Sequence, residues 1–442
     1  MKKNYFLFVV LLYAYFPIFS QEGFQYLSSK KKIVIPCQIS NNLVILPIKM
    51  NGVSLNFLLD TGVENTILFS LEEADSVQFK KVEKIKIRGL GSGESINAYR
   101  SENNKVEIGE YIDKNHEIYI ILDQEINFSA QLGIPVHGIL GYQFFNNNLI
   151  EINHIAKKVL VHRSKEDFSL NKLKKYTEIP ISIELEKPYV KSKVILNNIE
   201  KEVKLLIDTG GSDAIWLFED GKEINCPLLF FEDFLGRGFS GDIFGKRSRI
   251  QSFTIGSLTL DNPTTSFPNL SSLKGATLVE GRKGSIGSGI IKRFNVLFDY
   301  RNSKMYLKKN KEFGAPFNYN MSGMEVQHNG KELVQEEVEL KTNLVDKETR
   351  NSMIFLFEAP IKYKFTLKPI FEISNIRPNS PADLAGLKKG DILKKINNTN
   401  VYKYKLQDII ALLQSEEDKW ISVEYDRKGK IIRTEFQLKK IL

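Results

Sequence analysis

Short apolar runs that alternate with polar positions dominate the first three quarters of the chain. Residues 43–50 and 190–196 are typical, and an Asn-Gly or Asn-Asn pair follows each of them. Runs of this kind that end at turn residues predict strands joined by hairpins. Helical periodicity is brief over the same region, so the pattern predicts a mainly β fold.

The middle of the chain contains an internal repeat. Residues 55–68 and 203–217 both carry Asp-Thr-Gly after an apolar run, and the two aspartates, Asp60 and Asp208, are 148 positions apart. A glycine follows later in each copy, after Ile139-Leu140 in the first and after Ser285-Ile286 in the second, and these glycines, Gly141 and Gly287, are 146 positions apart. Landmarks that recur in one order at nearly one offset indicate a duplication. We therefore predict two β-rich lobes, at residues 21–167 and 168–312.

The pattern changes after residue 312. Residues 313–364 are polar and charged, and we assign them to a linker or to an N-terminal extension of the next domain. From residue 365 to 442 the pattern predicts a small α+β domain, with a short helix that begins at Pro381. A second, amphipathic helix is predicted from residues that share one helical face: Leu406, Ile409, Ile410 and Leu413.

The first twenty residues form an export signal in this interpretation. Lys2 and Lys3 precede a stretch that is almost wholly apolar as far as Phe19. This stretch is shorter than the about 20 apolar residues that a membrane span requires. We therefore predict a signal peptide at residues 1–20 and a periplasmic or secreted protein. Ile18 is larger than the residue usual before a cleavage site, so a membrane tether through an uncleaved signal stays an alternative.

Composition excludes several classes of protein. Hydrophobic residues make up 42% and charged residues 26%, which excludes a disordered chain, a collagen and a multi-span membrane protein. The net charge is +9, but lysines alternate with glutamates, so we expect no nucleic-acid partner. The five histidines form no His-x-x-x-His pair, and we expect no metal and no cofactor. Cys37 and Cys226 either pair in an oxidising compartment or remain free thiols.

The repeated Asp-Thr-Gly is the strongest candidate for chemistry. One copy would be weak evidence, because the same residues often make a plain strand-to-turn junction. Two copies related by a repeat favour a symmetric pair of carboxylates. Two adjacent carboxylates do not both ionise readily, so one keeps a proton while the other is an anion. Such a pair can activate a water molecule on one side and donate to a carbonyl oxygen on the other.

The segment from Phe57 to Leu68 resembles the active-site segment of retropepsins, and Asp208-Thr209-Gly210 resembles the second-lobe motif of bilobal aspartic peptidases. The resemblance covers residues 30–310 and implies two pseudo-symmetric retropepsin-like β-barrel lobes. It implies that Asp60 and Asp208 form a catalytic dyad and that the hydroxyl groups of Thr61 and Thr209 form hydrogen bonds between the lobes. It also implies that Gly62 and Gly210 let backbone amides approach the carboxylates, and that Gly141 and Gly287 end the strands beside the two loops.

Two features bear on how far this resemblance extends. Pepsin-like enzymes carry Ser or Thr after the motif, where this chain has Val63 and Gly211. Without that hydroxyl the carboxylate anion is less stabilised, so we expect activity at mildly acidic to neutral pH rather than near pH 2. Glycine-rich segments at residues 89–93 and 236–241 follow the two aspartates at similar distances. They are either two flaps over the substrate or ordinary hairpin turns.

The C-terminal pattern resembles the PDZ domains of bacterial exported proteases, through Ser380-Pro381-Ala382 and the later Gly390-Asp391. PDZ domains bind extended peptides by adding a strand beside their amphipathic helix. The segment at 367–371 lacks the glycines that would capture a terminal carboxylate. The alternatives are therefore that the domain binds internal peptide segments or that it docks on the protease lobes. The implied peptide-binding residues are Ile370, Phe371, Ile373, Leu406 and Ile410.

Together these patterns predict an exported aspartic endopeptidase that acts on proteins or peptides. Its PDZ domain would recruit or gate substrates by binding a peptide segment. The alternative is a catalytically silent peptide-binding protein that uses the protease fold and the PDZ domain. A cell-surface structural module is a third hypothesis, with no support beyond export. Intact Asp60 and Asp208 argue against a silent protein, since loss of either is the simplest route to inactivity.

Overall fold

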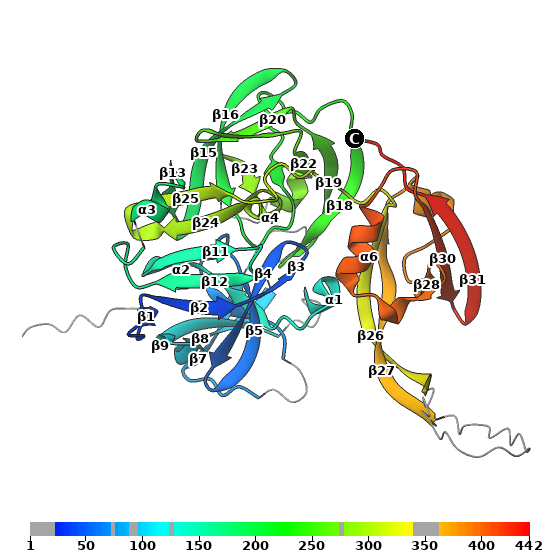
Figure 1. The fold of residues 1–442 in the computed structure, drawn as a ribbon, viewed down its shortest axis with the longest axis horizontal. Coiled ribbons are helices and arrows are strands. Elements are labelled where there is room, and N and C mark those ends of the chain that lie inside the picture. Colours follow the sequence, from blue (N-terminus) through cyan, green and yellow to red (C-terminus); the bar gives the residue numbers. More distant parts are fainter. Residues whose placement is uncertain are drawn as a thin grey trace, which may run out of the picture.

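The computed structural model describes residues 23–71, 76–87, 96–122, 128–168, 170–273, 278–338 and 362–442. It confirms a mainly β chain, in which four sheets account for the described strands (Figure 1). The predicted signal peptide at 1–20 and the glycine-rich segment at 89–93 lie outside the described residues. Among the helices of the described ranges, none has the length and apolar character needed to cross a membrane.

Lobe 1 is built on a nine-stranded sheet in the order β1-β9-β6-β10-β5-β4-β8-β7, with β3 beside β4. Strand β5 becomes more buried along its length, and its last residues, Phe57 to Leu59, all lie in the core. The strands are β1 (Gln25–Tyr26), β3 (Gln38–Ser40), β4 (Leu43–Met50), β5 (Val53–Leu59), β6 (Thr66–Leu68), β7 (Val82–Ile87), β8 (Ile96–Ile108), β9 (Tyr111–Ile121) and β10 (Gly138–Leu140).

Lobe 2 repeats this arrangement in a ten-stranded sheet, in the order β18-β19-β22-β17-β23-β16-β15-β20-β21, with β14 beside β15. In each lobe the strand before the aspartate has a parallel neighbour, β10 for β5 and β23 for β16. The strands are β14 (Ser182–Glu184), β15 (Lys187–Leu196), β16 (Ile199–Ile207), β17 (Ile215–Leu217), β18 (Phe231–Gly238), β19 (Gly241–Arg249), β20 (Ser252–Ile255), β21 (Leu258–Asp261), β22 (Thr264–Pro268) and β23 (Arg282–Ile286).

A six-stranded sheet joins the two lobes, in the order β13-β25-β24-β11-β12-β2. At its centre β11 of lobe 1 pairs antiparallel with β24 of lobe 2, with Ile152 opposite Val296. Both side chains are fully buried in a core cluster that spans the two lobes, which makes the lobes one packed unit. The strands are β2 (Lys32–Pro36), β11 (Leu149–Asn153), β12 (Lys158–His162), β13 (Thr177–Pro180), β24 (Phe294–Asp299) and β25 (Lys304–Lys309).

The helices of the two lobes are short. Helices α2 and α4 occupy matching places, because they begin directly after Gly141 and Gly287. The helical segments are α1 (Phe128–Leu132), α2 (Tyr142–Asn146), α3 (Leu170–Leu173), α4 (Ser288–Ile291), η1 (Leu270–Leu273) and η2 (Tyr300–Asn302). The two cysteines, Cys37 and Cys226, are free and half-buried, and burial raises the pKa of both thiols to about 12.

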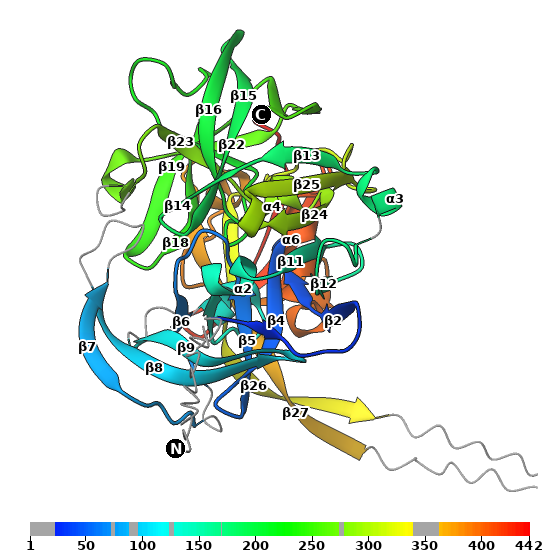
Figure 2. The ribbon, with the colours of Figure 1, turned by 90° about the vertical axis from the view of Figure 1, so that its left-hand side faces the viewer.

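The C-terminal domain has its own six-stranded sheet, in the order β26-β27-β28-β30-β31, with β29 beside β28. Ser380 caps α5 by accepting a hydrogen bond from the Asp383 N–H. Its elements are β26 (Met324–Val338), β27 (Lys362–Ile376), α5 (Pro381–Leu384), β28 (Ile392–Ile396), β29 (Thr399–Asn400), η3 (Val401–Lys403), α6 (Leu406–Leu413), β30 (Trp420–Arg427) and β31 (Lys430–Gln437). Figures 1 and 2 show the domain beside both lobes, with β26 and β27 extending from it as a ribbon.

Candidate active site

The two Asp-Thr-Gly loops begin where buried strands end. Asp60 follows β5, and its N–H donates to the Leu140 carbonyl of β10 at 3.0 Å. Asp208 follows β16, and its N–H donates to the Ile286 carbonyl of β23 at 2.9 Å. The same local hydrogen bonding therefore fixes both aspartates at the ends of their strands.

The threonines of the two loops lock the lobes together. The Thr61 N–H donates to the Thr209 hydroxyl at 3.0 Å, and the Thr209 N–H donates to the Thr61 hydroxyl at 3.0 Å. The Thr61 hydroxyl donates to the Ile207 carbonyl at 2.6 Å, and the Thr209 hydroxyl donates to the Leu59 carbonyl at 2.8 Å. Both side chains are buried, so all four hydrogen bonds are shielded from water. Thr61 and Thr209 thus join the two loops through reciprocal hydrogen bonds.

The reciprocal threonine bonds bring the two carboxyl groups close together, since a Cβ added at Gly62 would lie 3.1 Å from Asp60 Oδ1 and 3.2 Å from Asp208 Oδ1. The Gly62 N–H donates to Asp60 Oδ1 at 2.7 Å. The N–H groups of Gly210 and Gly211 both donate to Asp208 Oδ1, at 3.0 and 2.9 Å. A Cβ added at Gly210 would lie 2.1 Å from Asp60 Oδ2, which explains why this position requires glycine.

The environments of the two carboxyl groups differ. Burial and the neighbouring charge of Asp208 raise the pKa of Asp60. Burial also raises the pKa of Asp208, but the Arg282 guanidinium opposes that rise, whereas backbone N–H groups lower the pKa of both carboxyl groups. The Arg282 guanidinium therefore favours the anionic form of Asp208, and the two carboxyl groups titrate as a coupled pair.

Gly141 and Gly287 lie where the two strands β10 and β23 pass the active-site loops. A Cβ at Gly141 would lie 2.4 Å from the Val63 carbonyl oxygen, and a Cβ at Gly287 would lie 2.4 Å from the Asp213 carbonyl oxygen. Any other residue would push the strand away from the loop that it supports. The residues implied by the resemblance in the two lobes are thus all gathered around the two aspartates.

Arg282 is not among the site residues predicted from the sequence. It is the first residue of β23, two positions before Gly284, and Val136 stands at the matching place before Gly138 in lobe 1. Setting the two halves side by side at the offset of 146 would have revealed this difference. A single cation in one lobe therefore makes an otherwise symmetric pair of carboxyl groups unequal.

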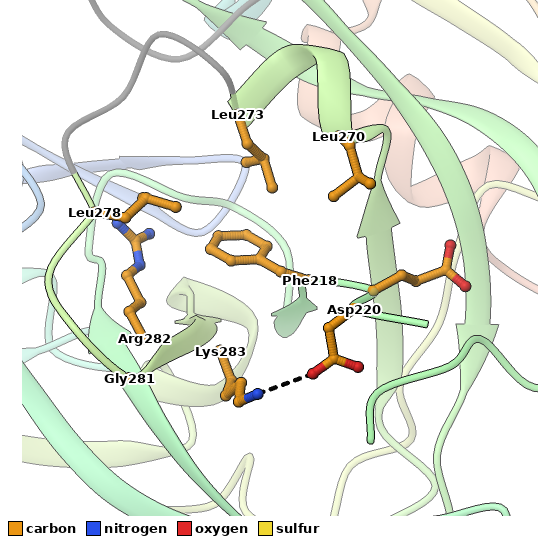
Figure 3. A pocket seen from close by; sticks show the side chains of 9 residues that line it. Phe218, Asp220, Leu270, Leu273, Leu278, Gly281, Arg282 and Lys283 are labelled. Atoms are coloured by element: carbon orange, nitrogen blue, oxygen red, sulfur yellow. Dashed lines mark hydrogen bonds and ion pairs between the residues drawn. The ribbon is translucent and has the colours of Figure 1, made fainter. Parts of the chain in front are cut away.

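Arg282 also forms one wall of a pocket of about 520 Å³ in lobe 2 (Figure 3). Its guanidinium lies over the Phe218 ring at 5.3 Å, and Leu270, Leu273 and Leu278 supply further apolar lining. The ion pair between Asp220 and Lys283, at 2.8 Å, lies on another side of the pocket. The pocket combines apolar walls with charged groups, a combination suited to binding a side chain of a peptide.

The second glycine-rich segment forms the turn between β18 and β19, and Gly238 pairs with Gly241 at its tip. Phe239 of this tip packs on Phe128 of lobe 1, with ring centroids 6.1 Å apart. The β18–β19 hairpin therefore reaches from lobe 2 to lobe 1. Within the described ranges, no three His, Cys, Asp or Glu side chains gather so as to hold a metal ion.

Comparison with known families identifies two parts of the chain. Residues 46–144 match the family model described as aspartyl protease, and residues 372–427 match the model described as PDZ domain. The chain contains an aspartyl protease domain and a C-terminal PDZ domain. The first match includes Asp60 and Gly141, while Asp208 lies beyond it and joins the site through the fold. A comparison with curated protein sequences finds no match.

The strand that borders the long helix of the PDZ domain is not the expected one. Helix α6 packs against β26, the edge strand, whereas β27 lies between β26 and β28. Phe371 and Ile373 on β27 are completely buried core residues, and Ile370 is on the same inner strand. These three residues therefore lie one strand away from the helix. The cause is that the sheet begins at Met324, well before residue 365, with residues 339–361 separating its first two strands in sequence.

The two residues predicted on the helix itself have different surroundings. Leu406 is buried at the start of α6, and Ile410 is only partly buried against the domain core. The place that a carboxylate-binding loop would take is the segment before β26 rather than the segment before Phe371. There the Met321 N–H donates to the Leu413 carbonyl at the end of α6, at 3.0 Å.

Proposed function

We propose that the protein is an aspartic endopeptidase whose catalytic dyad is Asp60 and Asp208. The observation that carries this proposal is the contact between the two carboxyl groups, which the reciprocal threonine bonds hold in place. The match of residues 46–144 to the aspartyl protease family supports it independently. Such a pair at the meeting point of two lobes is suited to water-mediated hydrolysis of a peptide bond.

In the proposed reaction the water lies between the carboxyl groups and the scissile carbonyl. The Asp208 carboxylate takes a proton from the water as its oxygen bonds to the carbonyl carbon, and protonated Asp60 gives its proton to the carbonyl oxygen. The tetrahedral diol then collapses. Asp208 returns its proton to the amide nitrogen as the C–N bond breaks, and one diol hydroxyl returns a proton to Asp60. Each carboxyl group ends in its starting state.

The proposal extends to partners and location. The protease and PDZ domains favour proteins or peptides as substrates, and the PDZ domain would recruit them or control their access. The apolar stretch of residues 1–20 supports export to the periplasm or the medium, with a membrane tether if that stretch stays attached. Peptides are the natural occupants of the pocket beside Arg282 as well.

The test is cleavage of a peptide library by the purified protein between pH 3 and 8. Asp60→Asn and Asp208→Asn are run in parallel, together with a statine-type inhibitor that mimics the tetrahedral diol. We expect cleavage by the wild type, none by either variant, and inhibition by the diol mimic. Absence of cleavage by the folded wild type, with peptide binding retained, would instead support the catalytically silent peptide-binding protein.

A further inference from the structure

The PDZ domain contacts two segments of the protease lobes, and these two segments also contact each other. One segment is α1 with the turn after it in lobe 1, and the other is the β18–β19 hairpin of lobe 2. Figure 1 shows α1 and β18 on the side of the lobes that faces α6 and β26. We call the line along which α6 and β26 meet the seam, and define it by Leu406, Gln407 and His328.

Helix α1 is fastened to the seam by hydrogen bonds and by close packing. Gln407 Nε2 donates to the Ser40 hydroxyl at 2.6 Å and to the Leu132 carbonyl at 2.7 Å. A Cβ added at Gly133 would lie 2.8 Å from Leu406 Cβ and 3.5 Å from His328 Cε1. The turn after α1 is therefore inserted between helix and edge strand, which is where PDZ domains take their peptides.

The β18–β19 hairpin rests on the same helix at its tip. Phe239 packs edge-on against Phe128, the first residue of α1, at 6.1 Å. Phe128 in turn packs against Phe69 of lobe 1 at 5.1 Å. If α1 leaves the seam, the hairpin loses the support of its tip.

The base of the hairpin is held by the PDZ domain directly. Phe231 of β18 packs against Tyr319 at 5.4 Å, and the Arg377 guanidinium lies over the Phe231 ring at 4.1 Å. Arg377 also faces Asp233 of β18 at 3.8 Å. The PDZ domain thus contacts the base of the hairpin, and α1, which itself contacts the PDZ domain, packs against the tip.

An ion-pair chain continues from the hairpin base into the active-site loop of lobe 2. Asp233 pairs with Arg247 of β19 at 2.9 Å, and Arg247 pairs with Asp213 at 3.0 Å. Asp213 ends the loop that starts at Asp208, and it also accepts a hydrogen bond from the Trp216 indole at 2.8 Å. Movement of the hairpin base therefore acts on the loop that carries one of the two aspartates.

We propose that α1 is a built-in competitor for the PDZ seam, and that an internal segment of a partner protein entering the seam displaces α1 and releases the β18–β19 hairpin from lobe 1. This rests on the proposed function, because release admits substrate only if the dyad cleaves peptides. An internal segment fits better than a free C-terminus, since the bond between Met321 and Leu413 closes the far end of the seam. His328 Nε2 is buried without a hydrogen-bond partner in the described residues and would gain one from such a segment.

The first test loosens α1 by substitution in the full-length protein. Gly133→Ala places a methyl group against Leu406 at a backbone φ of +67°, and Gly52→Ala is its control, with φ at +92° and nothing within 4 Å. Hydrogen exchange is followed at residues 128–133 and 236–241. We expect Gly133→Ala to speed exchange about tenfold at both segments, the effect of a modest overpacking, and Gly52→Ala to change neither. Faster exchange at 128–133 alone would overturn the coupling.

A second pair of variants removes side-chain bonds without backbone strain. Gln407→Ala deletes both hydrogen bonds to lobe 1, whereas Gln437→Ala deletes a bond to the Asp418 carbonyl inside the PDZ domain. We expect only Gln407→Ala to speed exchange at residues 128–133 and 236–241. Unchanged exchange in a folded Gln407→Ala variant, together with unchanged exchange in Gly133→Ala, would show that α1 is not held by the seam.

The third test adds a competitor in trans. The probe is a synthetic peptide with the sequence of residues 128–135, and a scrambled peptide is its control. We expect the probe to speed hydrogen exchange at residues 236–241 of the wild type and to raise the rate at which the protein cleaves a reporter peptide. If exchange responds but no variant cleaves any peptide, the proposed function fails and the competitor role stands. If the protein cleaves peptides but the probe and the variants change neither exchange nor rate, the competitor role is overturned.

Discussion

Replacing Thr209 by valine tests how strongly the threonine lock stabilises the lobes. The Thr209 hydroxyl accepts from the Thr61 N–H at 3.0 Å and donates to the Leu59 carbonyl at 2.8 Å. Valine has nearly the same shape, so no cavity forms, but both buried partners lose their hydrogen bonds. Each buried group left unpaired costs about 1–3 kcal/mol, so the free energy of unfolding should fall by about 2–6 kcal/mol.

Urea unfolding, followed by tryptophan fluorescence, measures this loss. The control is Thr254→Val, because Thr254 makes its hydroxyl bond to Thr259 on the exposed surface, at 3.0 Å. Exposed positions usually change stability by less than about 0.5 kcal/mol. Equal effects of the two substitutions, both below about 1 kcal/mol, would refute the argument that the buried lock holds the lobes together.

Three further predictions concern charged residues around the site. Arg282→Val removes the cation that lowers the pKa of Asp208, so the acidic limb of the pH–rate profile should shift to higher pH. Arg282→Lys keeps the charge and should leave that limb nearly in place. An unmoved acidic limb in the valine variant would contradict this role of Arg282. Arg293 donates to backbone carbonyls of the segment from Glu312 to Pro316, so Arg293→Ala should cost about 3–5 kcal/mol in urea unfolding and expose that segment to limited proteolysis. Burial and the charge of Asp233 raise the pKa of Glu325 to about 7, so ionisation of Glu325 destabilises the folded state. The wild type should therefore lose stability relative to Glu325→Gln as pH rises from 5 to 7. A difference in stability that stays constant over this range would contradict the raised pKa.

The meeting of the two Asp-Thr-Gly loops could be predicted from the sequence, because the signal for each loop is local and occurs twice. An apolar strand, an Asp-Thr-Gly loop and a later glycine determine most of each half-site, as the bonds from Asp60 to Leu140 and from Asp208 to Ile286 show. The fold then needs only the pseudo-symmetry of the two halves to bring these loops together.

The remaining features depend on contacts between distant segments, which no local pattern records. The sequence contains the difference between Arg282 and its counterpart Val136, but the effect of Arg282 on Asp208 depends on the folded chain. The sequence left residues 313–364 open as a linker or an N-terminal extension of the PDZ domain, because residues 339–361 separate β26 from β27 in sequence. The contact of Gln407 with Ser40 joins residues 367 positions apart, and only the folded chain shows it.

The pH dependence of peptide cleavage is the most direct test of the central claim, that Asp60 and Asp208 share one proton and activate a water molecule. We predict a bell-shaped profile of kcat/KM with a maximum at mildly acidic to neutral pH, because activity requires one proton on the pair. Asp60→Asn and Asp208→Asn should each abolish it. Cleavage that survives in either variant, or a maximum near pH 2, would show that the two aspartates do not act as such a pair.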